Sequence, residues 1–201
     1  MSIISFSGPH GSGKTTLINR MLLSEKPDAF INNEFEIDFI KKFPSFSVLS
    51  NFERSLIRLY HRYYVFQRNL TLKNQDDHKI ILISRGIYDS IAYIETYYRL
   101  GIILQHEYDI LHNIYSNIQY MPKTIILIPP VEVIMKRLGK RRNEKVRVKR
   151  DRIFSHEDTI EFVTTMHDIF EKFRDDVNVF YAVDNEDDDI KKIVAWINDG
   201  K

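Results

Sequence analysis

The chain of 201 residues is long enough to bury one sizeable hydrophobic core, and we expect one domain over residues 1–201. It contains no cysteine, which excludes a disulfide scaffold and a cysteine-ligated zinc site. No apolar run reaches the roughly 18 residues that span a bilayer, and Met1 leads directly into a strand pattern rather than a signal peptide. We therefore expect a cytoplasmic protein without a membrane partner.

Apolar runs and helical spacing alternate along the whole chain. Five runs are typical of short buried strands and cover residues 3–7, 29–32, 79–84, 124–128 and 178–183. The helices predicted around them cover residues 14–23, 51–73, 88–99, 107–118, 131–138, 157–173 and 190–197. Strands that alternate with helices predict an α/β fold with a five-stranded parallel sheet.

A phosphate-binding pattern lies between the first predicted strand and the first predicted helix. Gly8-x₄-Gly13-Lys14-Thr15 matches the P-loop in full, and its strand–loop–helix context is the one that this motif needs. Its backbone N–H groups and the helix N-terminus attract phosphates, Lys14 reaches the β- and γ-phosphates, and Thr15 places its hydroxyl on Mg²⁺. We expect a three-layer P-loop NTPase sandwich with ATP and Mg²⁺ as cofactors. The candidate ATP-binding residues are Gly8, Gly11, Ser12, Gly13, Lys14, Thr15 and Thr16.

A second motif closes the strand predicted over 79–84 and opens the following helix. It resembles the thymidylate kinase pattern Asp-Arg-Tyr-x-x-Ser-Ser-x-Ala-Tyr, with Arg85, Ser90, Ala92 and Tyr93 in register. The resemblance implies that Arg85 and Tyr93 hold an acceptor nucleotide. The acid of that pattern, which helps to organise Mg²⁺, is replaced here by Ser84.

The helix predicted over 51–73 carries two further resemblances. Residues 64–68 are similar to the Phe-Ala-Ala-Asp-Arg motif of thymidylate kinases, which implies that Arg68 contacts the acceptor phosphate. The same region resembles deoxynucleoside kinases, in which a Phe-Gln pair reads the base, so that Gln67 takes that role here. In that family a glutamate after the second strand is the general base, and Glu34 or Glu36 fits this position.

These resemblances leave two acceptor classes open. A monophosphate already carries a nucleophilic oxyanion and needs positioning and charge neutralisation, whereas a 5′-hydroxyl must lose a proton. Arg68 and Arg85 favour a monophosphate acceptor, as in the conversion of dTMP to dTDP, and the acids around Glu36 favour a nucleoside. We expect a nucleoside monophosphate kinase, with a deoxynucleoside kinase as the alternative.

Positive charge is concentrated between residues 136 and 152. Ten basic and two acidic residues give this segment a charge of +8, and the remaining 19 basic and 26 acidic residues give −7. We expect a lid that closes over ATP and whose Arg141 and Arg152 stabilise the transferring phosphoryl group together with Lys14 and Arg85. A nucleic-acid contact and a solvated loop are the alternatives; the segment has no aromatic residue on which bases could stack.

Two further functions stay open at this level. The basic segment allows a kinase or ATPase that acts on nucleic acid, and Ser84 in place of an acid allows a nucleotide-binding protein without catalysis. We expect His10, within the P-loop, to be a spacer or an acceptor contact rather than a base. The expectation of a homodimer rests only on the families that the chain resembles.

Overall fold

The computed structural model describes residues 2–24, 30–31, 46, 48–73, 80–145, 154–183 and 187–199. Its strands form one parallel sheet in the order β2-β3-β1-β4-β5. They are β1 (Ser2–Ser7), β2 (Phe30–Ile31), β3 (Ile80–Ser84), β4 (Lys123–Leu127) and β5 (Val179–Ala182). The register pairs Phe6 with Ser84 and Ser7 with Ile126, so the carboxyl ends of three strands meet at one edge.

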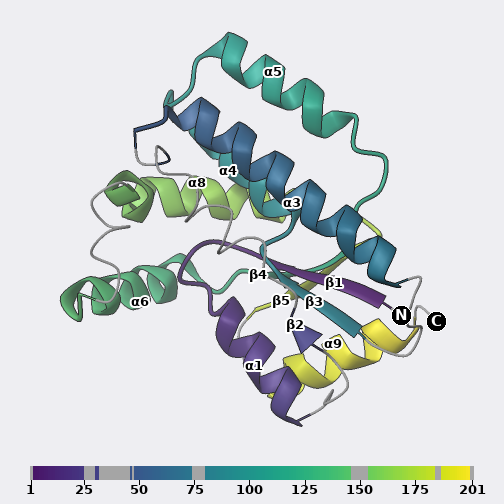
Figure 1. The fold of residues 1–201 in the computed structure, drawn as a ribbon. Helices are drawn as coiled ribbons and strands as arrows, with labels where there is room; N and C mark the ends of the chain where they lie inside the picture. The colour runs from purple at the N-terminus through teal and green to yellow at the C-terminus, as the bar shows by residue number, and fades with distance from the viewer. Residues whose placement is uncertain are drawn as a thin grey trace.

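Helices cover both faces of this sheet (Figure 1). On one face lie α1 (Lys14–Ser24) and α9 (Asp187–Asp199), and on the other lie α3 (Asn51–Lys73), α4 (Ile87–Arg99) and α8 (Ile160–Glu171). The side chains of successive strand residues point alternately into the hydrophobic cores on the two faces, because side chains alternate across a sheet. The predicted α/β fold with a parallel sheet is thus confirmed.

Three further elements surround this framework: α5 (Gln105–Ser116), α6 (Val131–Asn143) and the 3₁₀ helix η1 (Ser155–Asp158). Helix α5 lies against α3 and α4, away from the sheet (Figure 1). Helix α6 packs on α8 through Ile134, Leu138 and Val163. No helix among the described residues is long and apolar enough to cross a membrane.

Several helices differ from their predicted bounds by one to three residues at an end, and two differ in ways that affect the region around the site. The helix expected to end at residue 138 continues to Asn143, so the basic segment begins as an amphipathic helix whose Ile134 and Leu138 are buried. Residues 146–152, the rest of the expected lid, lie outside the described residues. The helix expected over 157–173 is divided, because Thr159 Oγ1 accepts a hydrogen bond from Phe162 N and caps α8.

Candidate active site

The loop between β1 and α1 is shaped by glycines in conformations that other residues avoid. Gly8 has a φ of 139°, and a Cβ on it would lie 2.2 Å from the carbonyl oxygen of Leu127 in β4. Gly11 has a φ of 87° and packs against Ile134 and Leu138 of α6. The loop is therefore fixed by its neighbours on two sides, as a preformed phosphate cradle requires.

Gly8→Ala is expected to lower the free energy of unfolding by about 3 kcal/mol, because the new Cβ collides with backbone and the positive φ is strained. Urea unfolding followed by circular dichroism measures this. Gly139→Ala is the control: Gly139 is exposed in α6, a Cβ there meets nothing within 4 Å, and a gain of up to about 1 kcal/mol is expected. Equal unfolding midpoints for Gly8→Ala and the wild type would contradict this account of the loop.

Lys14 is buried beneath the loop. Its Nζ donates hydrogen bonds to the carbonyl oxygens of Gly8 (2.6 Å) and Pro9 (2.8 Å) and to Ser12 Oγ (3.2 Å). Burial, reinforced by the nearby Arg85, lowers the pKa of Lys14 to about 7. An anion that binds in the cradle would stabilise the charged form of Lys14 and therefore raise its pKa.

We expect Lys14 to take up nearly one proton when ATP binds at pH 8. A group with a pKa of about 7 is only ~10% protonated at that pH, and the triphosphate stabilises its charged form. Calorimetric titration of ATP in two buffers of different ionisation enthalpy gives the number of protons. The Lys14→Met variant should show uptake near zero, and equal uptake by both proteins would contradict the assignment.

The same pKa shift predicts how stability depends on pH. The folded-state pKa of Lys14, about 7, lies below its ordinary value of 10.5, so the unfolded chain binds more protons between these two pH values. The contribution of Lys14 to folding therefore becomes more favourable as pH rises from about 7 to 10.5, and its cost is fully present below pH 7.

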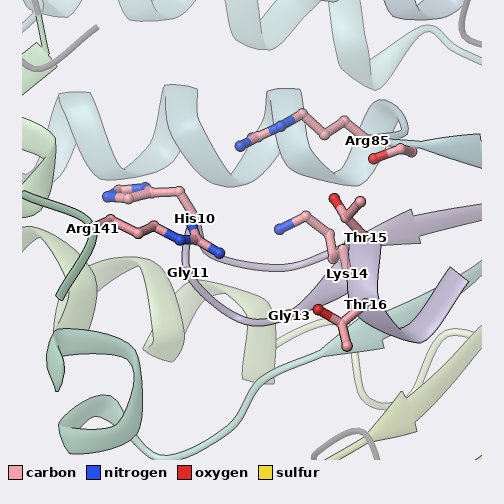
Figure 2. Close-up of a pocket in the computed structure, with 9 residues that line it drawn as sticks. His10, Gly11, Gly13, Lys14, Thr15, Thr16, Arg85 and Arg141 are labelled. Atoms are coloured by element: carbon pink, nitrogen blue, oxygen red, sulfur yellow. The ribbon is translucent and has the colours of Figure 1, made fainter. Parts of the chain in front are cut away.

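The cradle opens into a pocket at the carboxyl edge of the sheet (Figure 2). Side chains and backbone from the loop, the start of α1, the end of β3 and α6 line this pocket. The lining residues are His10, Gly11, Gly13, Lys14, Thr15, Thr16, Ser84, Arg85 and Arg141. The structure thus brings the predicted loop residues together with Arg85 and Arg141, two arginines distant from the loop in sequence.

Arg85 lies at the turn from β3 into α4. Its φ is 74°, a strained conformation for a residue with a side chain, and its backbone N–H donates to Phe6 O at 2.9 Å. Its guanidinium lies 3.8 Å from Asp89 Oδ1, while Asp89 Oδ2 accepts a hydrogen bond from Gly86 N. This turn therefore directs one cation and one buried carboxylate toward the loop.

Helix α3 contributes a row of arginines that the sequence analysis missed. Arg54, Arg58 and Arg62 are spaced by four residues, so they share one face of the helix. Arg62 is buried and donates to Ser90 Oγ at 2.8 Å, and its charge helps to lower the pKa of Lys14. The spacing of four was the signal that could have revealed this row.

Arg58, the middle arginine of this row, lies among aromatic side chains. Its guanidinium carbon lies 4.8 Å from the ring centre of Phe154, 5.5 Å from that of Phe46 and 5.8 Å from that of Tyr93. It also forms an ion pair of 3.7 Å with the buried Glu157. Cationic and aromatic groups thus continue from the phosphate cradle along α3.

Arg68 and Gln67 are not among the residues that line this pocket, and their predicted acceptor roles stay predictions. Arg68 lies six residues beyond Arg62, about 9 Å further along the axis and on a different face, and it is exposed. Phe66, the partner of Gln67 in the predicted base-reading pair, is buried in the core beneath the sheet. Among the arginines of α3, Arg62 is the one whose charge acts on Lys14.

Of the other predicted residues, Tyr93 is buried in α4 and its hydroxyl lies 3.0 Å from His10 Nδ1. Arg137 Nη1 donates to Ser12 O at 2.9 Å, so α6 contacts the P-loop directly. Glu36 and Arg152 lie outside the described residues, and their predicted roles stay predictions.

The fold and the phosphate cradle define a P-loop protein of the α/β class, and solved structures of the same fold are nucleoside and nucleotide kinases. Deoxyadenosine kinase from M. mycoides with bound dATP aligns with a TM-score of 0.64 over 98% of this chain and 100% of that chain. The same enzyme with dCMP and dCDP aligns with a TM-score of 0.68, over 98% and 99%. Thymidylate kinase from Candida albicans aligns with a TM-score of 0.69, over 98% and 89%.

Each of these structures is 18% identical to the chain, so the likeness is one of fold. Searches with models of sequence families and among curated protein sequences give no match. The fold is therefore shown by structure, and the chemistry is argued from the site.

Proposed function

We propose that this protein transfers the γ-phosphoryl group of ATP·Mg²⁺ to a nucleotide or nucleoside. One observation carries the proposal: the buried Lys14 of a P-loop lines a single pocket together with Arg85 and Arg141. Cations held this close repel one another, and this arrangement is stabilised when phosphate groups bind between them. The kinases that share the fold support the same chemistry.

The residues at the cradle fit Mg²⁺. The exposed Thr15 lines the pocket, and the buried Asp89 Oδ1 has no hydrogen-bond partner among the described residues, although Arg85 lies 3.8 Å away. The charge of Asp89 also acts on Lys14, so this carboxylate lies close to the phosphate cradle. When bound, Mg²⁺ would neutralise negative charge on the phosphates of ATP. Thr15 would ligate it, and Asp89 would take the place of the acid missing at Ser84.

Asp89→Asn is expected to raise by about tenfold the Mg²⁺ concentration that half-saturates the protein–ATP complex. Asparagine can still accept the hydrogen bond from Gly86 N, so α4 should keep its cap and the thermal midpoint should change little. Calorimetric titration of Mg²⁺, or spin resonance of Mn²⁺, measures the affinity without catalysis. Unchanged metal affinity would remove Asp89 from the metal site.

For the acceptor we propose a nucleoside monophosphate. Arg85 lines the pocket and the charge of Arg62 acts on Lys14, so we propose that these two arginines hold the acceptor phosphate beside the donor. The rings of Phe46, Tyr93 and Phe154 are buried around the guanidinium of Arg58, and we propose that the acceptor binds on this side of the site. Transfer would then proceed directly from donor to acceptor oxygen, with Lys14 and Arg141 stabilising the phosphoryl charge.

A deoxynucleoside is the second candidate acceptor, supported by the likeness to deoxyadenosine kinase. A 5′-hydroxyl needs a base, and Glu36 is the residue that we would assign to this role. Glu36→Gln should then abolish the reaction, whereas a monophosphate acceptor should tolerate the change.

The deciding experiment measures ADP formation from ATP·Mg²⁺ with a panel of nucleoside monophosphates and nucleosides, each product being identified. A diphosphate formed from dTMP or another monophosphate supports the main proposal. Products from nucleosides alone support the second candidate. Tight ATP binding without any phosphorylated product would refute kinase activity on these acceptors.

A further inference from the structure

A buried polar chain joins three separate elements beside the phosphate cradle. His10 Nε2, in the P-loop, lies 2.8 Å from Asp158 Oδ1 at the end of η1, and His10 Nδ1 lies 3.0 Å from the hydroxyl of Tyr93 in α4. His10 is 1% exposed and Asp158 is 8% exposed. The side chain at the third position of the P-loop is thus held from both ends.

The two nitrogens of the imidazole ring have different neighbours. His10 Nε2 lies 2.8 Å from Asp158 Oδ1 as a close polar contact whose geometry is not that of a hydrogen bond. The Tyr93 hydroxyl can donate to Nδ1 of a neutral ring or accept from a protonated one. The hydrogen bond between His10 and Tyr93 can therefore form with either protonation state of His10, as expected for a contact that holds the loop in place.

Asp158 also links the loop to α6. Its Oδ2 lies 3.7 Å from Arg142 Nη2, near the end of that helix. The same helix contacts the loop at two other points, where Arg137 donates to Ser12 O and where Gly11 packs against Leu138. The loop that binds the donor phosphate is thus tied to the elements before and after residues 146–153.

The other end of the chain lies on the acceptor side of the site. The Tyr93 ring packs against Phe162 of α8, with ring centres 6.0 Å apart, and the guanidinium of Arg58 lies over it. A shift of His10 would therefore move the donor loop relative to the surface that we assign to the acceptor. In-line transfer is sensitive to such shifts, since a misplacement of 1 Å can cost about a hundredfold in rate.

We propose that His10 and Asp158 are positioning residues that fix the donor phosphate loop relative to the acceptor surface on α4. This inference rests on the proposed function. Loss of the tie should affect transfer to the acceptor far more than ATP binding or hydrolysis of ATP by water, because only transfer needs both substrates held in register.

The test compares Asp158→Ala and Asp158→Asn with Glu161→Ala, which removes an exposed acid three residues away in α8. We expect Asp158→Ala to lower kcat for transfer by about 30-fold, with the Kd for ATP and the rate of ATP hydrolysis within about twofold of wild type. Asparagine keeps the size of the side chain and a polar oxygen beside His10 Nε2, so Asp158→Asn should recover most of kcat. Glu161→Ala should behave as wild type.

Equal losses of transfer and hydrolysis in Asp158→Ala would show a merely structural role and overturn the inference, as would an undiminished kcat. A second measurement needs no acceptor: hydrogen exchange at the backbone amides of residues 10–12 should accelerate at least tenfold in Asp158→Ala and not in Glu161→Ala. Unchanged exchange would refute the tie itself. If exchange is accelerated in Asp158→Ala but the wild-type protein phosphorylates no acceptor, the tie is supported and the proposed function is refuted.

Discussion

Replacing Lys14 with methionine is expected to reduce phosphoryl transfer about a thousandfold. The ammonium group is the cation that the P-loop itself supplies to the β- and γ-phosphates, and removal of one such electrostatic contact costs 10²–10³ in rate. Steady-state kinetics with the preferred acceptor measures the loss. Lys191→Met, an exposed change on α9, is the matched control and should leave the rate within about twofold.

The same substitution should not destabilise the fold. Burial lowers the pKa of Lys14, so at pH 7 the native protein bears a cost for holding this group that methionine does not have. The thermal midpoint of Lys14→Met should therefore equal or exceed that of the wild type. A large fall in midpoint would mean that the hydrogen bonds of Nζ to Gly8 O and Pro9 O dominate, and that the loss of activity reports unfolding.

Arg62→Ala is expected to lower kcat/KM for a monophosphate acceptor by a factor of 10² to 10³, which corresponds to removal of a charge-assisted contact that is strongest in the transition state. Arg62→Lys should recover only part of the activity, because an ammonium group cannot reproduce a bidentate contact. Measurements at varied acceptor concentration separate kcat from KM.

Arg68→Ala is the control for this prediction, on the same helix and with the same change in charge. Since Arg68 is exposed and about two turns beyond Arg62, its loss should change kcat/KM less than twofold. A large effect of Arg68→Ala with a small effect of Arg62→Ala would restore the register inferred from sequence and contradict the structure.

Local patterns determined much of the framework. The P-loop pattern predicted a strand–loop–helix unit over residues 3–23, and the structure has it over residues 2–24. The prediction succeeded because glycines at fixed spacing and the flanking apolar runs are both local properties. The long helix was predicted with its observed bounds, Asn51–Lys73, since its apolar stripe spans six turns. The helix predicted over 157–173 is divided into η1 and α8 by the capping residue Thr159, and the sequence patterns did not predict this break.

Only the tertiary structure decided which face of α3 meets the active site. Periodicity shows that a helix is amphipathic, but it does not show which turn lies beside a loop more than forty residues away in sequence. The packing of α3 on α4 brings Arg62 to Ser90 and leaves Arg68 exposed. A motif match of five residues could not resolve that choice, because arginines recur along this helix.

The sequence alone therefore determined the class of fold and the phosphate-binding loop, which depend on interactions between neighbours in the chain. The rest of the site depends on contacts between distant segments: Arg62 and Arg85 beside Lys14, and the tie from His10 to Asp158. His10 looked like a spacer because its partners lie 83 and 148 residues away, at Tyr93 and Asp158. Folding of the parallel sheet brings these segments together, and the buried charges then require the partners that only this packing supplies.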